Sequence, residues 1–119
     1  MIDRRPFVQK ILKNRKPNLR VISGLGTSTW DVMSGGDNTS NFGFIGAMGQ
    51  AIPFSLGLAK SQPDLRILLF TGDGDTLMSL GSIATVANHP VSNLSIVVLD
   101  NESYVCLLYT SDAADESVC

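Results

Sequence analysis

The stretch RILLFTGDGDTLMSLGSIATVANHPVSNLSIVVLDNES, residues 66–103, decides the fold of this chain. It contains two apolar runs, at 66–71 and 94–99, that are typical of strands buried on both faces of a parallel sheet. Residues 75–88 lie between them and place apolar side chains at helical spacing. A strand, helix, strand order predicts an α/β fold: a parallel sheet with helices on both faces and right-handed crossovers. The face expected to be apolar carries Leu77, Leu80, Ala84 and Ala87.

The residues before 66 continue this alternation. We expect a short buried strand at 19–23, then a glycine turn, and then a helix whose start is marked by the run Thr27-Ser28-Thr29. Glycine and asparagine at 35–38 predict a loop. The other expected elements are a helix within 3–15 with the apolar stripe Phe7, Val8, Ile11 and Leu12, a short extended segment at 42–45 and a helix within 46–60.

Composition restricts the function classes. The chain has 119 residues, enough for one domain, with 44% hydrophobic and 17% charged residues. A net charge of −2 argues against nucleic-acid binding, which depends on phosphate neutralisation. No apolar run approaches the length of a membrane span, and no signal-peptide pattern opens the chain, so we expect no membrane partner and a cytoplasmic location. Basic residues gather in the first twenty positions, which favours a solvated helix surface or a subunit contact.

The C-terminal segment differs from the rest of the chain. Both cysteines, Cys106 and Cys119, fall in it, which excludes a CxxC or zinc framework and makes a structural disulfide unexpected. The run CLLYTSDAADE at 106–116 is similar to the read-through translation of a sequencing adapter. We therefore predict an incomplete domain over 1–104, truncated at its C-terminal end, and a non-native tail over 105–119. The alternative is a genuine acidic C-terminus.

Oxygen-bearing residues follow the two strands of the deciding stretch. Asp73 follows the first and Asn101 the second, and ligands of open α/β sheets bind beyond the carboxyl ends of strands. One carboxylate and one amide oxygen suit Mg²⁺, which keeps positions for phosphate oxygens and water. Gly72 and Gly74 allow close backbone approach, and the amides of Gly74 and Asp75 open a helix, where an anion is favoured. Together these features predict a metal-bridged diphosphate site, although each motif alone also fits a tight turn.

The spacing of these motifs supports a more specific prediction. Gly72-Asp73-Gly74, followed after 25 residues by Asp100-Asn101, resembles the cofactor signature of the thiamine diphosphate-dependent enzymes. This resemblance implies that Asp73, Asn101 and the backbone carbonyl of Ser103 bind Mg²⁺. It also implies that thiamine diphosphate is the cofactor.

Two positions depart from the family pattern. Asp100 replaces the first asparagine of the pair. Asp75 stands where many members have serine, and a carboxylate beside a diphosphate is unfavourable unless it turns away as a helix cap.

An upstream turn extends the resemblance. Gly46-Ala47-Met48-Gly49 is similar to the family turn whose bulky apolar residue separates the two cofactor rings, which implies that role for Met48; ordinary core packing is the alternative. The carbonyl of Gly46 would then accept a hydrogen bond from the aminopyrimidine. Thr27 and Ser28 correspond to the loop near the diphosphate.

Within the family, the segments 41–49 and 76–85 resemble the diphosphate-binding subunits of sulfopyruvate and phosphonopyruvate decarboxylase-like enzymes. This implies a lyase that decarboxylates a small 2-oxo acid. A pyrimidine-binding subunit or domain would supply the activating glutamate, so no catalytic residue is assigned to this chain. We expect an oligomer and no turnover by this chain alone. The alternatives are an acetolactate synthase-like carboligase, to which Pro53 points, and a non-catalytic phosphate- or nucleotide-binding module.

Overall fold

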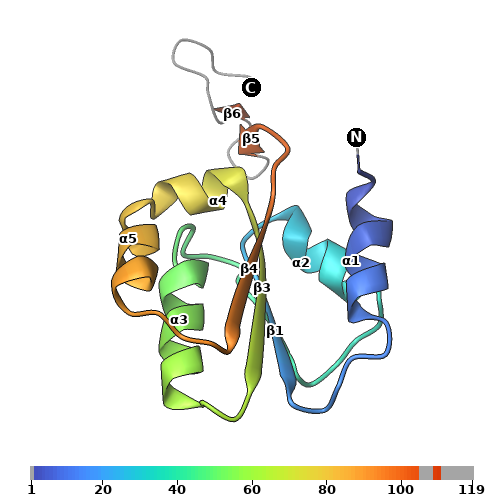
Figure 1. Ribbon diagram of the computed structural model, residues 1–119. Coiled ribbons are helices and arrows are strands. Elements are labelled where there is room, and N and C mark those ends of the chain that lie inside the picture. Colours follow the sequence, from blue (N-terminus) through green and yellow to red (C-terminus); the bar gives the residue numbers. More distant parts are fainter. Residues whose placement is uncertain (1, 105–108, 111–119) are drawn as a thin grey trace.

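A four-stranded parallel sheet forms the centre of the molecule (Figure 1). The computed structural model describes residues 2–104 and 109–110. The strands lie in the order β2-β1-β3-β4, so the predicted α/β parallel sheet is confirmed. The bounds are β1 Leu19–Ser23, β2 Asn41–Gly43, β3 Arg66–Gly72 and β4 Leu94–Leu99.

The register of the sheet brings the carboxyl ends of three strands to one edge. Ser23 at the end of β1 pairs with Phe70 of β3, and Gly72 at the end of β3 pairs with Leu99 of β4. Parallel pairing therefore places the residues that follow each strand next to one another. This edge of the sheet carries the candidate site.

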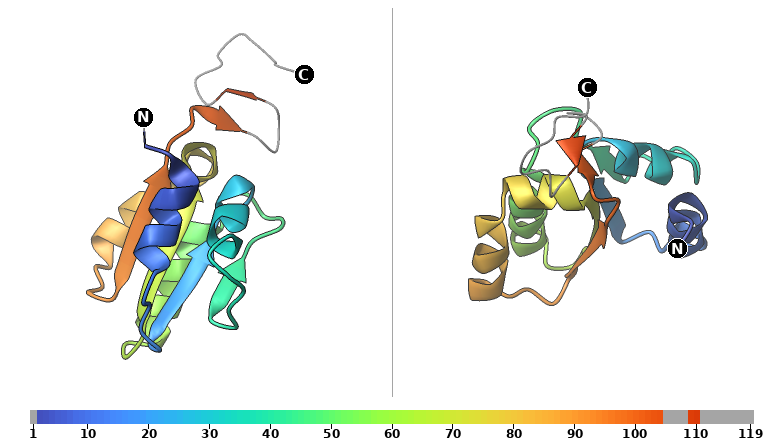
Figure 2. Two further views of the ribbon diagram at one scale, coloured as in Figure 1. Left: turned by 90° about the vertical axis from the view of Figure 1, so that its right-hand side faces the viewer. Right: turned by 90° about the horizontal axis from the view of Figure 1, so that it is seen from above.

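Helices cover both faces of the sheet, as predicted (Figures 1 and 2). Helices α3 (Ala51–Ser61) and α5 (Gly81–Asn88) lie on one face, whereas α1 (Arg4–Leu12) and α2 (Thr27–Met33) lie on the other. The short helix α4 (Asp73–Met78) runs across the carboxyl edge of the sheet.

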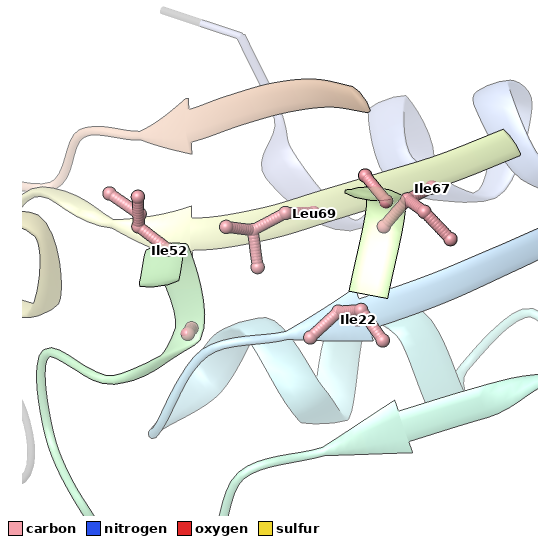
Figure 3. Packing of buried hydrophobic residues seen from close by; sticks show 6 residues of the cluster. Ile22, Ile52, Ile67 and Leu69 are labelled. Carbon is pink, nitrogen blue, oxygen red and sulfur yellow. The ribbon is translucent and has the colours of Figure 1, made fainter. Parts of the chain in front are cut away.

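Each face has its own apolar core because successive strand residues point to opposite sides. Ile22 and Leu69 pack with Ile52 and Ile67 under α3 and α5 (Figure 3). Their chain neighbours Val21 and Phe70 belong to the other core. Burial of side chains of this size stabilises the fold by about 1.5–3 kcal/mol each relative to exposure. The second core is completed by Val8 of α1 and Val32 of α2.

The single helix predicted over 75–88 is wrong. The chain forms α4 and α5 instead, with Ser79 out of helical conformation at φ −132° and ψ 44°. The hydroxyls of Ser79 and Ser82 hydrogen-bond to each other, and the Ser82 N–H donates to the Ser79 carbonyl three residues earlier, a tighter bond than that of an α-helix. The break ends the helical periodicity. Leu77, Leu80, Ala84 and Ala87, expected on one apolar helix face, are exposed, and Val86 packs against the core instead.

The last described elements are the short strands β5 (Ser103–Tyr104) and β6 (Tyr109–Thr110), which pair antiparallel. Most of the predicted tail, residues 105–108 and 111–119, lies outside the described residues, and the prediction of a non-native tail stays untested. None of the helices in the described part of the chain combines the length and apolar character needed to cross a membrane.

Candidate functional site

A pocket at the carboxyl edge of the sheet gathers most of the predicted site residues. It is bordered by the loops that follow β1, β2, β3 and β4, which are separated by up to about 75 residues in the chain. The predicted residues that line it are Thr27, Ser28, Met48, Gly72, Gly74, Asp75, Asn101 and Ser103. Two predicted site residues, Gly46, which is exposed, and Asp73, are not among the lining residues.

Asp73 is the first residue of α4 and lies next to the loop after β4. Its Oδ1 accepts a hydrogen bond from the backbone N–H of Asn101 at 3.4 Å. Its Oδ2 is buried and has no hydrogen-bond partner within the described residues. Leaving a buried carboxylate oxygen without a partner is costly, so this atom is suited to an external cation.

The loop after β4 is held in shape by its own side chains. Asn101 Oδ1 accepts the N–H of Ser103 at 3.1 Å, and Asp100 Oδ1 accepts the N–H of Glu102 at 3.0 Å. Glu102, between Asn101 and Ser103, has a positive φ of 53°. These local bonds present Asn101 and Ser103 on the same pocket as α4.

This donor set fits magnesium better than a softer metal. No group of three or more His, Cys, Asp or Glu residues suited to a metal occurs in the described part of the chain. Asp73 would supply one carboxylate, Asn101 an amide oxygen and Ser103 a backbone carbonyl, and the remaining positions would go to phosphate oxygens and water, as Mg²⁺ prefers. The residues present therefore fit a magnesium-bridged diphosphate.

Two helices begin at the pocket. The first-turn N–H groups of α2 and α4 have no acceptor within their own helices and are available to an anion. Gly26, which precedes α2, has a φ of 102°, and a Cβ there would meet nothing within 4 Å. Glycine is favoured at this position because its left-handed conformation disfavours other residues.

The turn after β2 brings Met48 to the pocket. Ala47 and Gly49, on either side of Met48, have positive φ values of 58° and 90°, and Gln50 N–H donates to the Ala47 carbonyl. Met48 is half-buried and lines the pocket together with the start of α4. Met48 thus shares a pocket with Thr27, Ser28 and Asn101, and its role against the cofactor rings stays a prediction.

The carboxylate of Asp75 faces the protein interior. Its Oδ1 accepts the Gly49 N–H and its Oδ2 accepts the Thr71 hydroxyl, both at 2.6 Å. Asp75 does not act as a helix cap, because α4 begins at Asp73 and has no side-chain capping bond. The carboxylate is nevertheless held by other groups, and the contribution of Asp75 to an anion site would come from its backbone N–H.

Arg4 is a pocket residue that the sequence did not single out. It forms an ion pair with Asp31 of α2, whose side chain is 1% exposed, and Arg5 also contacts Asp31, at 3.3 Å. Arg4 is the one basic side chain lining the pocket among the described residues. Nothing in the sequence distinguishes Arg4 from the other basic residues near the N-terminus, because its position depends on how α1 packs against α2.

The parallel sheet, the acidic and amide residues after β3 and β4, and the glycine loops define a phosphate-cofactor domain of the α/β class. Residues 25–117 match the family described as thiamine pyrophosphate enzyme, C-terminal TPP binding domain. The chain belongs to this family, and the resemblance found in its sequence motifs is confirmed.

Curated relatives place the chain near two decarboxylases. It is 38% identical over 104 residues to the sulfopyruvate decarboxylase subunit beta of Methanothermobacter thermautotrophicus, covering 87% of this chain and 55% of that protein. It is 36% identical over 94 residues to the phosphonopyruvate decarboxylase of Streptomyces hygroscopicus, covering 79% and 23%. The acetolactate synthase isozyme 1 large subunit of Escherichia coli is 33% identical over 61 residues, 51% of this chain and 11% of that protein. The chain thus spans about half the length of the beta subunits that it matches.

Proposed function

We propose that this chain binds thiamine diphosphate with Mg²⁺ and forms the diphosphate-binding part of a decarboxylase of small 2-oxo acids. The observation that carries the proposal is the buried Oδ2 of Asp73, which has no hydrogen-bond partner in the described part of the chain. Asp73 contacts the backbone of Asn101, and Asn101 lines the pocket. Family membership supports the cofactor, and relatives named as decarboxylases support the reaction class.

Each loop of the pocket has its own part in this proposal. Asp73, Asn101 and the Ser103 carbonyl hold Mg²⁺ and so orient the diphosphate. Met48 would pack against the cofactor rings, and the Gly46 carbonyl would accept a hydrogen bond from the aminopyrimidine. Thiamine diphosphate, when bound, supplies the electron sink for cleavage of the bond to the departing carboxylate. The backbone groups that contact the diphosphate are those of Thr27, Ser28, Gly72, Gly74 and Asp75.

The activating glutamate comes from a pyrimidine-binding partner in this proposal. Residues 2–104 contain one glutamate, Glu102, which is exposed in the loop after β4. The sulfopyruvate decarboxylase relatives are themselves named beta subunits, which supports a multi-subunit enzyme. We expect no turnover by this chain without its partner, an oligomeric enzyme and a cytoplasmic location.

An acetolactate synthase-like carboligase is the second candidate. Its support is the match to acetolactate synthase large subunits, which covers 51% of this chain, against 79–87% for the decarboxylases named above. The decarboxylase is therefore favoured. The two reactions differ in product, because decarboxylation gives an aldehyde and carbon dioxide while the carboligase joins two 2-oxo acids with loss of one carbon dioxide.

The test is a product assay of the full-length protein in complex with its pyrimidine-binding subunit. Sulfopyruvate, phosphonopyruvate and pyruvate are supplied with thiamine diphosphate and Mg²⁺, and carbon dioxide, aldehyde and acetohydroxy acid are measured. We expect equal amounts of aldehyde and carbon dioxide from a 2-oxo acid, lost on chelation of Mg²⁺. Acetohydroxy acid as the main product would establish the carboligase, and nucleotide binding without thiamine diphosphate affinity would establish the non-catalytic module.

A further inference from the structure

Asp75 connects separate parts of the pocket. Its side chain is buried, at 7% exposure, and each carboxylate oxygen accepts one hydrogen bond. The Gly49 N–H that donates to Oδ1 comes from a turn 26 residues earlier, and the Thr71 hydroxyl that donates to Oδ2 belongs to β3. Bonds to a carboxylate are stronger than bonds between neutral groups, so these two contacts fix the turn to the strand.

The loop after β1 packs against the same carboxylate. A Cβ built on Gly24 would lie 2.4 Å from Asp75 Oδ2 and 2.6 Å from Thr71 Oγ1, too close unless the pair moved. The backbone N–H of Gly24 also donates to the carbonyl of Phe70 at 2.8 Å. The loops after β1, β2 and β3 therefore meet at Asp75.

The turn that carries Met48 needs such support. Ala47 adopts a positive φ of 58° although it is not glycine, and this conformation persists only where the surroundings enforce it. Gly49, at φ 90°, lies against α4, and a Cβ there would lie 3.0 Å from that of Met78. Within the described residues, the bond from the Gly49 N–H to Asp75 is the one side-chain hydrogen bond that ties this turn to α4.

We propose that Asp75 is a positioning residue that fixes Met48 relative to the Asp73 and Asn101 metal site. Its carboxylate holds the Gly49 end of the Met48 turn on the same helical turn of α4 that presents Asp73. The catalytic consequence rests on the proposed function. Without this anchor Asp73 and Asn101 stay in place, but the Met48 side chain is no longer held in position relative to them.

The test compares Asp75→Ala with Asp75→Asn in the full-length protein assembled with its partner. Asparagine keeps the size and an acceptor for the Gly49 N–H, and its amide can donate to Thr71, so it serves as the matched rescue variant. The first readout is hydrogen exchange of the Gly49 amide, measured without cofactor. We expect exchange to accelerate at least about tenfold in Asp75→Ala and to remain near the wild-type rate in Asp75→Asn.

The second readout separates turnover from cofactor affinity. We expect kcat to fall about tenfold to a hundredfold in Asp75→Ala, while the Kd for thiamine diphosphate changes about threefold or less, because displacement of a positioning group affects chemistry more than anchoring. Exposed Asp64→Ala is the control. Should Asp75→Ala fail to fold, Thr71→Val, which removes one of the two donors at similar volume, replaces it and should give a smaller change of the same sign.

An unchanged hydrogen-exchange rate of the Gly49 amide in Asp75→Ala or Thr71→Val would overturn the positioning role. A Kd for thiamine diphosphate that rises by the same factor as kcat falls would also overturn it. If wild-type protein does not bind thiamine diphosphate, the proposed function fails. The exchange measurement still decides whether Asp75 holds the turn, because it requires no cofactor.

Discussion

Asp73 and Asp75 stand two residues apart in the first turn of α4, yet Asp73 leaves one buried oxygen without a partner in the described structure while Asp75 has both oxygens paired. The two side chains have the same chemistry and differ only in what surrounds them. Asp73, with its unpaired oxygen, is suited to bind a metal cation. Asp75 instead connects the Gly49 turn to Thr71 of β3. The difference teaches that residue type and spacing locate a site, whereas the packing around each side chain assigns its role.

Asp73→Ala should have the largest effect on this comparison. It removes the charged ligand of the proposed metal site, and loss of one partner from a buried charged pair costs about 3–5 kcal/mol. We expect magnesium-dependent affinity for thiamine diphosphate to fall at least about a hundredfold, measured by calorimetry on the full-length complex. Exposed Asp64→Ala is the control, and a Kd for Asp73→Ala equal to that of the control would remove Asp73 from the site.

Asn101→Ala should have the next largest effect. It removes a neutral ligand and the bond to the Ser103 N–H that shapes the loop. The expected loss of affinity is about tenfold to a hundredfold, since a hydrogen bond or ligand contact involving a charged group contributes about 1.5–3 kcal/mol. Asp100→Ala removes the other side-chain bond of the loop, from Glu102 N–H, without removing a ligand. An equal loss in both variants would mean that loop shape alone matters.

Substitution of Met48 should affect turnover more than the affinity for thiamine diphosphate. Met48→Ala should lower kcat about tenfold while the Kd for thiamine diphosphate changes only a few-fold, because the diphosphate anchor remains. Met48→Leu nearly preserves volume and should keep most activity. Steady-state kinetics and calorimetry on both variants decide the matter, and normal turnover in Met48→Ala would make Met48 a core residue only.

The smallest expected effect concerns the two arginines that share Asp31. Arg4 lines the pocket and Arg5 does not. Arg4→Gln should weaken thiamine diphosphate binding about twofold to fivefold, since Asp31 and solvent already reduce the field of the guanidinium. Arg5→Gln should leave the Kd for thiamine diphosphate unchanged. It is the matched control for Arg4→Gln, and both variants are titrated at the same salt concentration because the expected difference is small.

Local sequence predicted the sheet well. The apolar runs of β3 and β4 and the short run of β1 are contiguous in the chain, and their pairing follows from the rules for parallel connections. Asp73 and Asn101 were predictable as neighbours if their strands pair, because each lies within two residues of the end of its strand, and β3 and β4 do pair.

The errors have long-range or subtle causes. The break at Ser79 depends on hydrogen bonds between serines that helical periodicity does not register. One partner of Asp75, Gly49, lies 26 residues earlier in the chain, and Arg4 of α1 lines the pocket while paired with buried Asp31 of α2. These contacts are tertiary, so no local pattern indicates them.

The most direct measurement is a calorimetric titration of thiamine diphosphate into the full-length complex, with Mg²⁺ and with a chelator, for wild type, Asp73→Asn and Asp75→Asn. Asparagine removes one charge from either position at constant size. If Asp73 is the metal ligand and Asp75 an internal anchor, binding requires Mg²⁺ in wild type, is lost in Asp73→Asn and is retained in Asp75→Asn. Binding that is independent of Mg²⁺, or that survives in Asp73→Asn and is lost in Asp75→Asn, would contradict the assignment of the two carboxylates.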